Sequence, residues 1–254
     1  MRKKKGKRVI LGFIIVIIII LNLYAVYFML ERNNDKKETL DMLEVIDNNV
    51  DIKEDEINSD INDNETIETM DLDLNNLKNI NSDTVAYLKV ESTNINYPVV
   101  KSNDNEYYLN HSFNKNKNQE GWIFLDYRNN INNLDNNTII YGHNRLTGTM
   151  FGTLKNLLNK SYQESTNHYI YLTTDNNNYI FEVFSTYITS NESYYLKTTF
   201  KNDNEYLEFL NTLKSRSTYN FNIELNSDDK IITLSTCSGS NDRMVVHGKL
   251  IYNN

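Results

Sequence analysis

The chain has 254 residues with 34 Asp and Glu against 26 Lys and Arg, a formal net charge of −8, and 1 cysteine. Six of the basic residues precede the first apolar run, so the rest of the chain carries 20 Lys and Arg against 34 Asp and Glu, a net charge of about −14. Such an acidic domain excludes nucleic acid as an electrostatic partner, and a lone cysteine excludes a disulfide within the chain.

The first predicted element is an apolar helix preceded by a basic tail. Residues 9–30 contain no charge, and a helix of these 22 residues spans roughly 33 Å, enough to cross a bilayer core. Because basic residues favour the cytoplasmic side, we predict a cytoplasmic tail over 1–8, a single-pass signal anchor over 9–30 and an extracellular remainder. A cleaved signal peptide is the alternative, but no clear small-residue cleavage site follows the run.

Residues 31–71 are predicted to form an acidic extracellular linker. The segment to Met70 contains neither Gly nor Pro. Apolar residues recur at spacings of three, three and four from Leu40 to Val50, which predicts an amphipathic helix. The charged residues 53–70 resemble a solvated spacer.

Residues 72–254 are predicted to form one mainly β domain, a barrel or a sandwich. Eight runs rich in Val, Ile, Tyr and Phe are separated by Asn, Asp, Ser or Gly, which is typical of strands and turns. The runs span residues 85–90, 95–100, 121–126, 137–142, 168–174, 179–189, 230–236 and 243–252. Helical spacing is found in 71–81, 148–159 and 202–216, and the last of these places Tyr206, Phe209, Leu210 and Leu213 on one face.

The only cysteine, Cys237, follows the seventh run and precedes the polar residues 238–242. A polar loop is a poor place for a buried sulfur, so the position favours a thiol near solvent at the end of a strand. Arg243 opens the next run, and a tight antiparallel pair would return its guanidinium close to the sulfur. A neighbouring cation lowers the pKa of a thiol and favours the nucleophilic thiolate. A buried apolar side chain or an intermolecular link are the alternatives.

A thiol nucleophile needs a proton donor for its leaving group. His143 directly follows an apolar run, so it occupies the same kind of strand end as Cys237. His247 lies on the same strand face as the arginine by its even spacing, and it stays open as an alternative. The other two histidines are His111, expected in a surface turn, and His168, expected at a strand start.

Other chemistries have little support in the sequence. It contains no C-x-x-C, no H-E-x-x-H and no cluster of His and Cys at ligand spacing, so no metal site is predicted. It contains no Gly-rich phosphate loop either. We expect no cofactor.

Several motifs together resemble those of the sortases. "TLSTC" at 233–237 with a following arginine is similar to the sortase cysteine signature, and "IIYGHN" at 139–144 to the sortase histidine strand. The stretches 80–113 and 121–129, the helical segment 194–217 and Ser235 are similar to those of class B in particular. The resemblance covers roughly Leu72 to Tyr252.

This resemblance implies a closed eight-stranded sortase-type β-barrel, with an N-terminal helix and a helical insertion before the cysteine strand. It further implies a cysteine transpeptidase in the cell membrane of a Gram-positive bacterium. In this family Cys237 would attack the threonine carbonyl of a C-terminal sorting motif on a surface protein and form a thioester. His143 would protonate the leaving amine, and Arg243 would stabilise the oxyanion or hold the substrate backbone. A peptidoglycan precursor or cross-bridge amine would then resolve the thioester.

The family's substrate groove transfers more loosely to this sequence. Its positions correspond to Asn105, Leu109, Tyr195, Leu196 and Ser235. The sequence departs from the family pattern in the five residues between the cysteine and the arginine, fewer than expected, and in Tyr87, where many relatives carry tryptophan. A thiol hydrolase of the same motif and an inactive sortase-like binding domain are the alternative functions.

Overall fold

The computed structural model describes residues 2–50, 53–58, 66–165, 168–190, 192–237 and 242–254, with the backbone alone for 2–9, 53–58, 66–69, 71 and 237. The chain divides into two compact units, Met1–Leu43 and Glu44–Asn254. Helix α1 (Arg2–Asn49) forms the first unit and contributes its last residues to the second. The large apolar side chains between Ile10 and Leu30 are exposed, and within the described parts of the chain α1 is the one helix long and apolar enough to cross a membrane.

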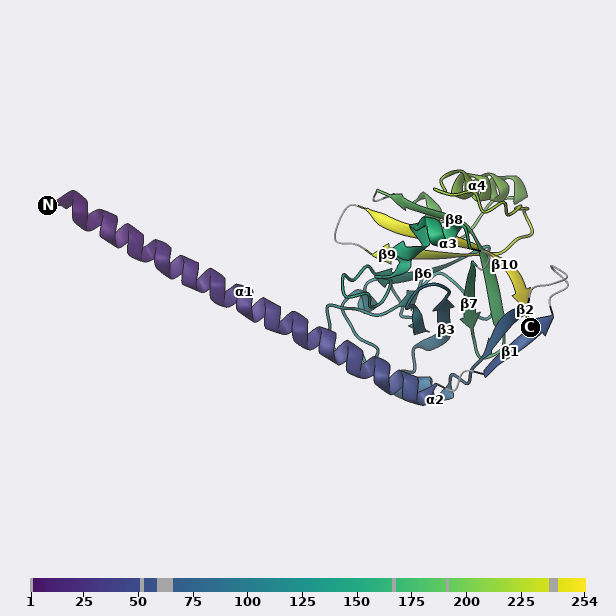
Figure 1. Cartoon of the computed structure of the whole chain (residues 1–254), viewed down its shortest axis with the longest axis horizontal. Helices are drawn as coiled ribbons and strands as arrows, with labels where there is room; N and C mark the ends of the chain where they lie inside the picture. Colours follow the sequence, from purple (N-terminus) through teal and green to yellow (C-terminus); the bar gives the residue numbers. More distant parts are fainter. Residues whose placement is uncertain (1, 51–52, 59–65, 166–167, 191, 238–241) are drawn as a thin grey trace. The chain divides into compact units, whose positions relative to one another are not determined.

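Eight strands of the second unit close into a barrel, in the order β10-β8-β7-β3-β4-β5-β6-β9. They are β3 (Thr84–Val90), β4 (Asn96–Val100), β5 (Phe124–Leu125), β6 (Asn137–His143), β7 (Tyr169–Thr173), β8 (Asn178–Thr189), β9 (Ile231–Cys237) and β10 (Arg243–Asn253). Six of them are labelled in Figure 1: β3, β6, β7, β8, β9 and β10. The pairs β4–β5 and β6–β9 are parallel, and the others are antiparallel. The predicted mainly β fold and the closed eight-stranded barrel are confirmed, and each predicted run corresponds to one strand.

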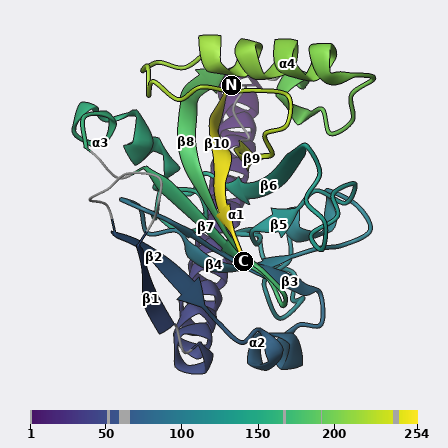
Figure 2. The same cartoon turned by 90° about the vertical axis from the view of Figure 1, so that its right-hand side faces the viewer.

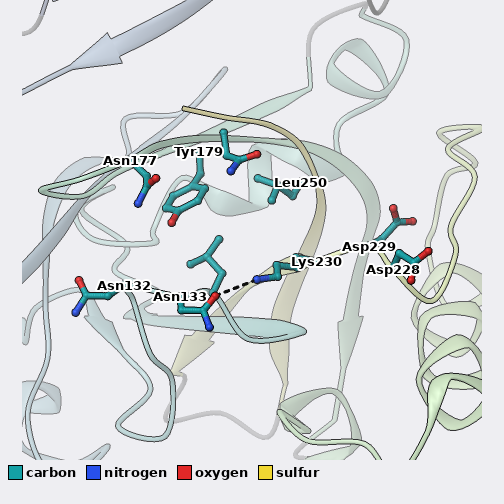
Figure 3. Close-up of a pocket in the computed structure, with 10 residues that line it drawn as sticks. Asn132, Asn133, Asn177, Tyr179, Asp228, Asp229, Lys230 and Leu250 are labelled. Carbon is teal, nitrogen blue, oxygen red and sulfur yellow. Dashed lines mark hydrogen bonds between the residues drawn. The ribbon is translucent and has the colours of Figure 1, made fainter.

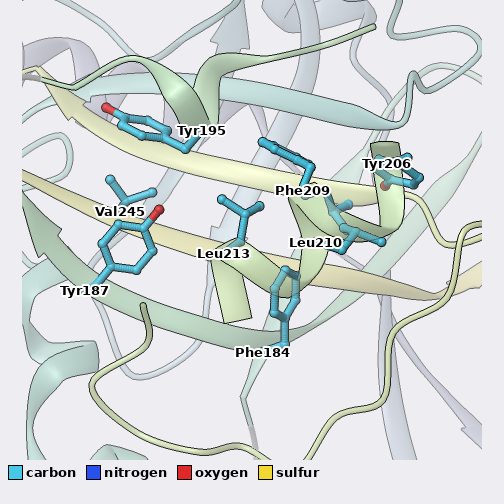
Figure 4. Packing of buried hydrophobic residues seen from close by; sticks show 9 residues of the cluster. Phe184, Tyr187, Tyr195, Tyr206, Phe209, Leu210, Leu213 and Val245 are labelled. Atoms are coloured by element: carbon cyan, nitrogen blue, oxygen red, sulfur yellow. The ribbon is translucent and has the colours of Figure 1, made fainter. Parts of the chain in front are cut away.

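Helix α4 (Asp203–Ser215) lies on the outside of the barrel, next to β8, β9 and β10 (Figure 2). The helix begins at Asn202, whose side chain accepts a hydrogen bond from the Glu205 backbone N–H at 3.0 Å, as an N-cap should. The four residues predicted to share one face are all buried. Figure 4 shows them packed with Tyr195 and with aromatic and apolar side chains of the strands; the cluster includes Phe184, Tyr187, Tyr195, Ile231 and Val245.

Segment 53–70 differs from the solvated spacer that we predicted. Strands β1 (Lys53–Asn58) and β2 (Thr66–Asp71) pair antiparallel through six residue pairs. The end of β2 is joined to the barrel, because the Thr173 hydroxyl donates to the Met70 carbonyl at 2.9 Å. Charge patterning predicts solvation of the side chains, but it does not prevent the backbone of two such segments from pairing.

The other predicted helices are present with different extents. Helix α2 (Asn75–Ile80) lies in the predicted 71–81 segment, and the apolar spacing from Leu40 falls on the last turns of α1, where Ile46 is fully buried. Segment 148–159 contains only a 3-10 turn, η2 (Leu154–Leu158), and α3 (Lys160–Gln163) follows it. The two do not join, because Asn159 has an extended backbone.

Candidate active site

Strands β6 and β9 run parallel and end side by side. Their register pairs Tyr141 with Ser235, and His143 with Cys237. Neighbouring strands lie roughly 4.8 Å apart, so the histidine and cysteine backbones are adjacent although they are far apart in the sequence. Since Cys237 is described by its backbone only, what we predict for its thiol stays a prediction.

The ring of His143 is held by the backbone of a neighbouring turn. Its Nε2 lies 2.7 Å from the carbonyl oxygen of Leu109, which ends the 3-10 turn η1 (Tyr107–Leu109). A carbonyl oxygen only accepts hydrogen bonds, so Nε2 carries the hydrogen and Nδ1 carries the lone pair of the neutral ring. The orientation and tautomer of the imidazole are therefore set by Leu109.

Gly121 provides the space for this contact. Its φ of +67° lies in the left-handed region that favours glycine. A Cβ at this position would lie 2.8 Å from His143 Cδ2 and 2.9 Å from the Leu109 carbonyl oxygen. Any side chain at residue 121 would push the ring or the turn out of place.

Arg243 begins β10, which pairs antiparallel with β9 as predicted. Its Nη1 donates to the carbonyl oxygen of Thr236 at 3.3 Å. The Thr236 hydroxyl in turn accepts from the Met244 backbone N–H at 2.9 Å. The hairpin thus holds a partly exposed guanidinium beside the residue that precedes Cys237.

The other three histidines are hydrogen-bonded to other groups. His247 is completely buried, and both of its ring nitrogens are hydrogen-bonded to hydroxyls. A buried ring of this kind is poorly placed to exchange protons with a substrate. His111 and His168 each contact a backbone carbonyl at 2.7 Å, those of Tyr107 and Tyr162.

The five candidate groove residues fall into two groups. Asn105, Leu109 and Leu196 are partly exposed. Tyr195 and Ser235 are completely buried, and their hydroxyls lie 3.0 Å apart. Tyr195 belongs to the 3-10 turn η3 (Tyr194–Leu196), so this contact joins the turn to the strand that carries the cysteine.

A buried carboxylate that sequence reasoning missed connects two of these candidates. Asp126 is fully buried and accepts from Asn105 Nδ2 at 3.0 Å and from the Tyr141 hydroxyl at 2.8 Å. Arg128 binds it in bidentate fashion at 2.8 and 2.7 Å and also donates to the Leu196 carbonyl at 3.0 Å. Burial favours a higher pKa for Asp126, but the hydrogen bonds from the arginine and the tyrosine outweigh it and hold the pKa below its usual range.

A separate hollow of about 440 Å³ lies at the opposite ends of β6 and β9 (Figure 3). Its lining is mostly polar and includes Asn132, Asn133, Asn177, Tyr179, Asp229 and Lys230. The residues that precede β6 and β9 form it together with the start of β8 and the end of β10, and none of the predicted site residues lines it. Among the side chains that the structure describes, no three His, Cys, Asp or Glu group together to hold a metal ion.

Comparison with known proteins gives a consistent set of relatives. Residues 88–251 match the family model described as sortase domain. The chain is 39% identical over 183 residues to Sortase B of Listeria monocytogenes, which covers 70% of this chain and 74% of that protein. The structure of Clostridium perfringens sortase B superposes with a TM-score of 0.67 at 40% identity, covering 71% of this chain and 100% of that one.

Two sortase B complexes are also similar to this chain, one of the Staphylococcus aureus protein with a substrate and one of a sortase B with triglycine. The complex with a substrate has a TM-score of 0.65 at 38% identity and covers 69% of this chain and 82% of that one. The complex with triglycine has the same TM-score and identity, with coverages of 69% and 83%.

Proposed function

Because this chain belongs to the sortase family, and within it to the sortase B proteins, it is a cysteine transpeptidase, and we propose that Cys237, His143 and Arg243 carry the reaction. The observation that supports this assignment most is the parallel register that pairs the histidine with the cysteine. The arginine hydrogen bond to Thr236 adds a cation beside the same strand end.

In the first half-reaction the Cys237 thiolate adds to the threonine carbonyl carbon of a C-terminal sorting motif. The peptide bond breaks, His143 gives a proton to the departing amine, and the acyl group stays on the sulfur as a thioester. Arg243 stabilises the negative charge on the carbonyl oxygen or holds the substrate backbone. Because the Leu109 carbonyl binds the Nε2 hydrogen, Nδ1 of His143 would take up the proton that leaves the Cys237 thiol and would then donate it to the departing amine.

In the second half-reaction a peptidoglycan amine attacks the thioester. An amide bond forms, the amine proton passes to His143, and the sulfur leaves as a thiolate. The sortase B complexes with a substrate and with triglycine support a peptide donor and a peptide amine acceptor for this chain. The partly exposed Asn105, Leu109 and Leu196 would contact the donor, and the buried Tyr195 and Ser235 would shape the wall behind it.

The N-terminal helix supports a location at the membrane. We assign 1–8 as the cytoplasmic tail, 9–30 as the anchor, 31–71 as the connection and 72–254 as the catalytic domain outside the cell. The exposed apolar surface of α1 between Ile10 and Leu30 supports this assignment. Extraction of the chain from intact cells by detergent, but not by high salt, tests it.

Product masses test the reaction itself. The full-length chain in detergent is incubated with a peptide library of sorting motifs and with triglycine. Transpeptidation gives a product with the mass of the N-terminal acyl fragment of the peptide plus that of triglycine. A thiol hydrolase gives the same fragment with only the mass of water added. Acyl transfer to triglycine supports the proposal, and hydrolysis alone at saturating triglycine would replace it with the hydrolase alternative.

Thiol reactivity separates an enzyme from an inactive sortase-like binding domain. We expect Arg243→Ala to slow alkylation of Cys237 by iodoacetamide at pH 7 by about tenfold, because losing a neighbouring cation raises the pKa of a thiol and lowers its thiolate fraction. Lys249→Ala is the matched control, since Lys249 lies on the same strand but binds Asp229 at 3.2 Å. Slow alkylation of the unaltered chain would favour the binding domain.

Substitution of Gly121 tests the placement of the histidine. We expect Gly121→Ala to lower kcat by about 10²-fold, because a Cβ would displace the His143 ring or the Leu109 carbonyl by a few tenths of an ångström or more. Gly148→Ala is the control, since its φ is also positive at +83° but a Cβ there meets only Thr153 at 3.7 Å. Equal effects of both changes would show that backbone strain, and not the histidine contact, explains the loss.

A further inference from the structure

A buried chain of hydrogen bonds lies beneath the η3 turn and links four strands of the barrel. It runs from Asn137 on β6 through Thr233 on β9 and His247 on β10 to Tyr187 on β8. The successive side-chain distances are 2.6, 2.9 and 2.9 Å. The Tyr194 hydroxyl of η3 extends the chain, at 2.8 Å from that of Tyr187.

The contacts of Asn137 determine which group donates and which accepts in each of these hydrogen bonds. The amide nitrogen of Asn137 donates to the carbonyls of Tyr195 and Lys197, both at 3.0 Å. The amide oxygen must therefore face Thr233 and accept its hydroxyl hydrogen. The Thr233 oxygen, having donated, is left to accept a hydrogen bond from the histidine.

The direction determines the tautomer of His247. Its Nδ1 carries the hydrogen and donates to Thr233, so its Nε2 accepts from the Tyr187 hydroxyl. The Tyr187 oxygen then accepts from Tyr194. Only a neutral ring can donate at one nitrogen and accept at the other. Burial lowers the pKa of His247 to about 3, which keeps the ring neutral.

The η3 turn is tied to the active site at further points. The hydroxyl of Tyr195 contacts that of Ser235, two residues before the cysteine. The carbonyl of Leu196 accepts from Arg128 at 3.0 Å. The histidine chain supplies the contacts beneath the turn, at Tyr194 and, through Asn137, at the Tyr195 and Lys197 carbonyls.

We infer that His247 is a positioning residue for peptide recognition, which fixes the η3 turn as one wall of the sorting-motif site. This role rests on the proposed function. His247 does not touch the reacting atoms, so its loss should weaken peptide binding while the chemistry of the thiol continues. The sequence left His247 open as an alternative general acid, and this inference gives it a structural role in peptide binding instead.

Steady-state kinetics of the full-length chain in detergent test the role, with the best-cleaved library peptide as the probe. We expect His247→Leu and Tyr187→Phe to raise KM for the peptide by about tenfold, the value of one buried hydrogen bond, with kcat changed by less than about threefold. His247→Gln, which offers both a donor and an acceptor, should recover part of the loss. The matched control is Tyr206→Phe, which removes a buried hydroxyl of the α4 cluster bonded to the Asn136 and Asp229 carbonyls at 2.8 Å.

Amide hydrogen exchange over residues 193–198 gives a readout that does not depend on activity. We expect faster exchange there in His247→Leu and Tyr187→Phe and unchanged exchange in Tyr206→Phe. If no peptide is cleaved by the unaltered chain, the proposed function fails while the exchange result still judges the positioning. The inference would be overturned if His247→Leu and Tyr187→Phe had a peptide KM no higher than Tyr206→Phe, lost only kcat, or left the amide exchange unchanged.

Discussion

Replacing Cys237 by alanine is expected to abolish peptide cleavage and acyl transfer, lowering the rate by about 10⁴-fold or more. The cysteine is the only one in the chain, so no second thiol can take over as nucleophile. The barrel should remain folded, because Cys237 lies at the end of β9, beyond the strand pairs with β10 that begin at Ser235. The rate of acyl transfer to triglycine, measured by product mass, checks this expectation.

The control for this change is the unaltered chain after complete alkylation of its thiol. Alkylation blocks the same sulfur without changing the sequence, so both samples should be equally inactive. Thermal unfolding followed by circular dichroism shows whether the alanine variant is folded. Peptide cleavage that persists in a folded Cys237→Ala variant would contradict the thioester mechanism.

Replacing His143 by alanine is expected to lower kcat by about 10³-fold, within the range for loss of a positioned general acid. Both half-reactions should be impaired, because the same ring gives a proton to the leaving amine and takes one from the acceptor amine. Burst kinetics with the peptide alone and with added triglycine measure the two steps separately.

Two other histidine variants are compared with this one. His168→Ala removes a ring that is bonded to the Tyr162 carbonyl at 2.7 Å, and it should leave kcat unchanged. His247→Ala should mainly perturb the buried network and the peptide KM. If His247→Ala abolished thioester formation while His143→Ala did not, the acid role would pass to His247.

The strands and helix α4 could be predicted because their side chains carry a strong pattern. Residues 139–141 of β6 are two isoleucines and a tyrosine, all buried, so the run is visible in the sequence. Helix α4 repeats apolar residues on one face, and that face packs on the strands. Local patterns of this kind follow from which side chains leave water, and neighbouring residues are enough to recognise them.

Features that depend on backbone pairing between distant segments could not be predicted. Nothing in the charged residues 53–58 and 66–71 indicates that β1 and β2 pair, because their ladder joins backbone groups. The helix predicted in 148–159 is reduced to the 3-10 turn Leu154–Leu158, because the backbone before it is not helical and has positive φ at Gly148 and Met150, +83° and +52°. The glycines at 148 and 152 are unfavourable in a helix, a signal that the apolar spacing concealed.

The catalytic candidates were identifiable because His143 and Cys237 each end a strand-like run, and the family resemblance added their roles. Their register is a property of the folded barrel, and it required the structure. Asp126 was missed because carboxylates are abundant in this chain, and only its full burial beside Arg128 distinguishes it. The short segment after Cys237, which departs from the family pattern, includes residues 238–241, which lie outside the described residues.

Intact-mass measurement of the full-length chain, quenched in acid seconds after mixing with a cleavable peptide, tests the assignment of the nucleophile directly. We predict an added mass equal to the N-terminal acyl fragment of the peptide, located on Cys237 by fragmentation and released on addition of triglycine. An adduct on a different residue, or cleavage at full rate with no adduct at any time point, would contradict the transpeptidase mechanism proposed for this chain.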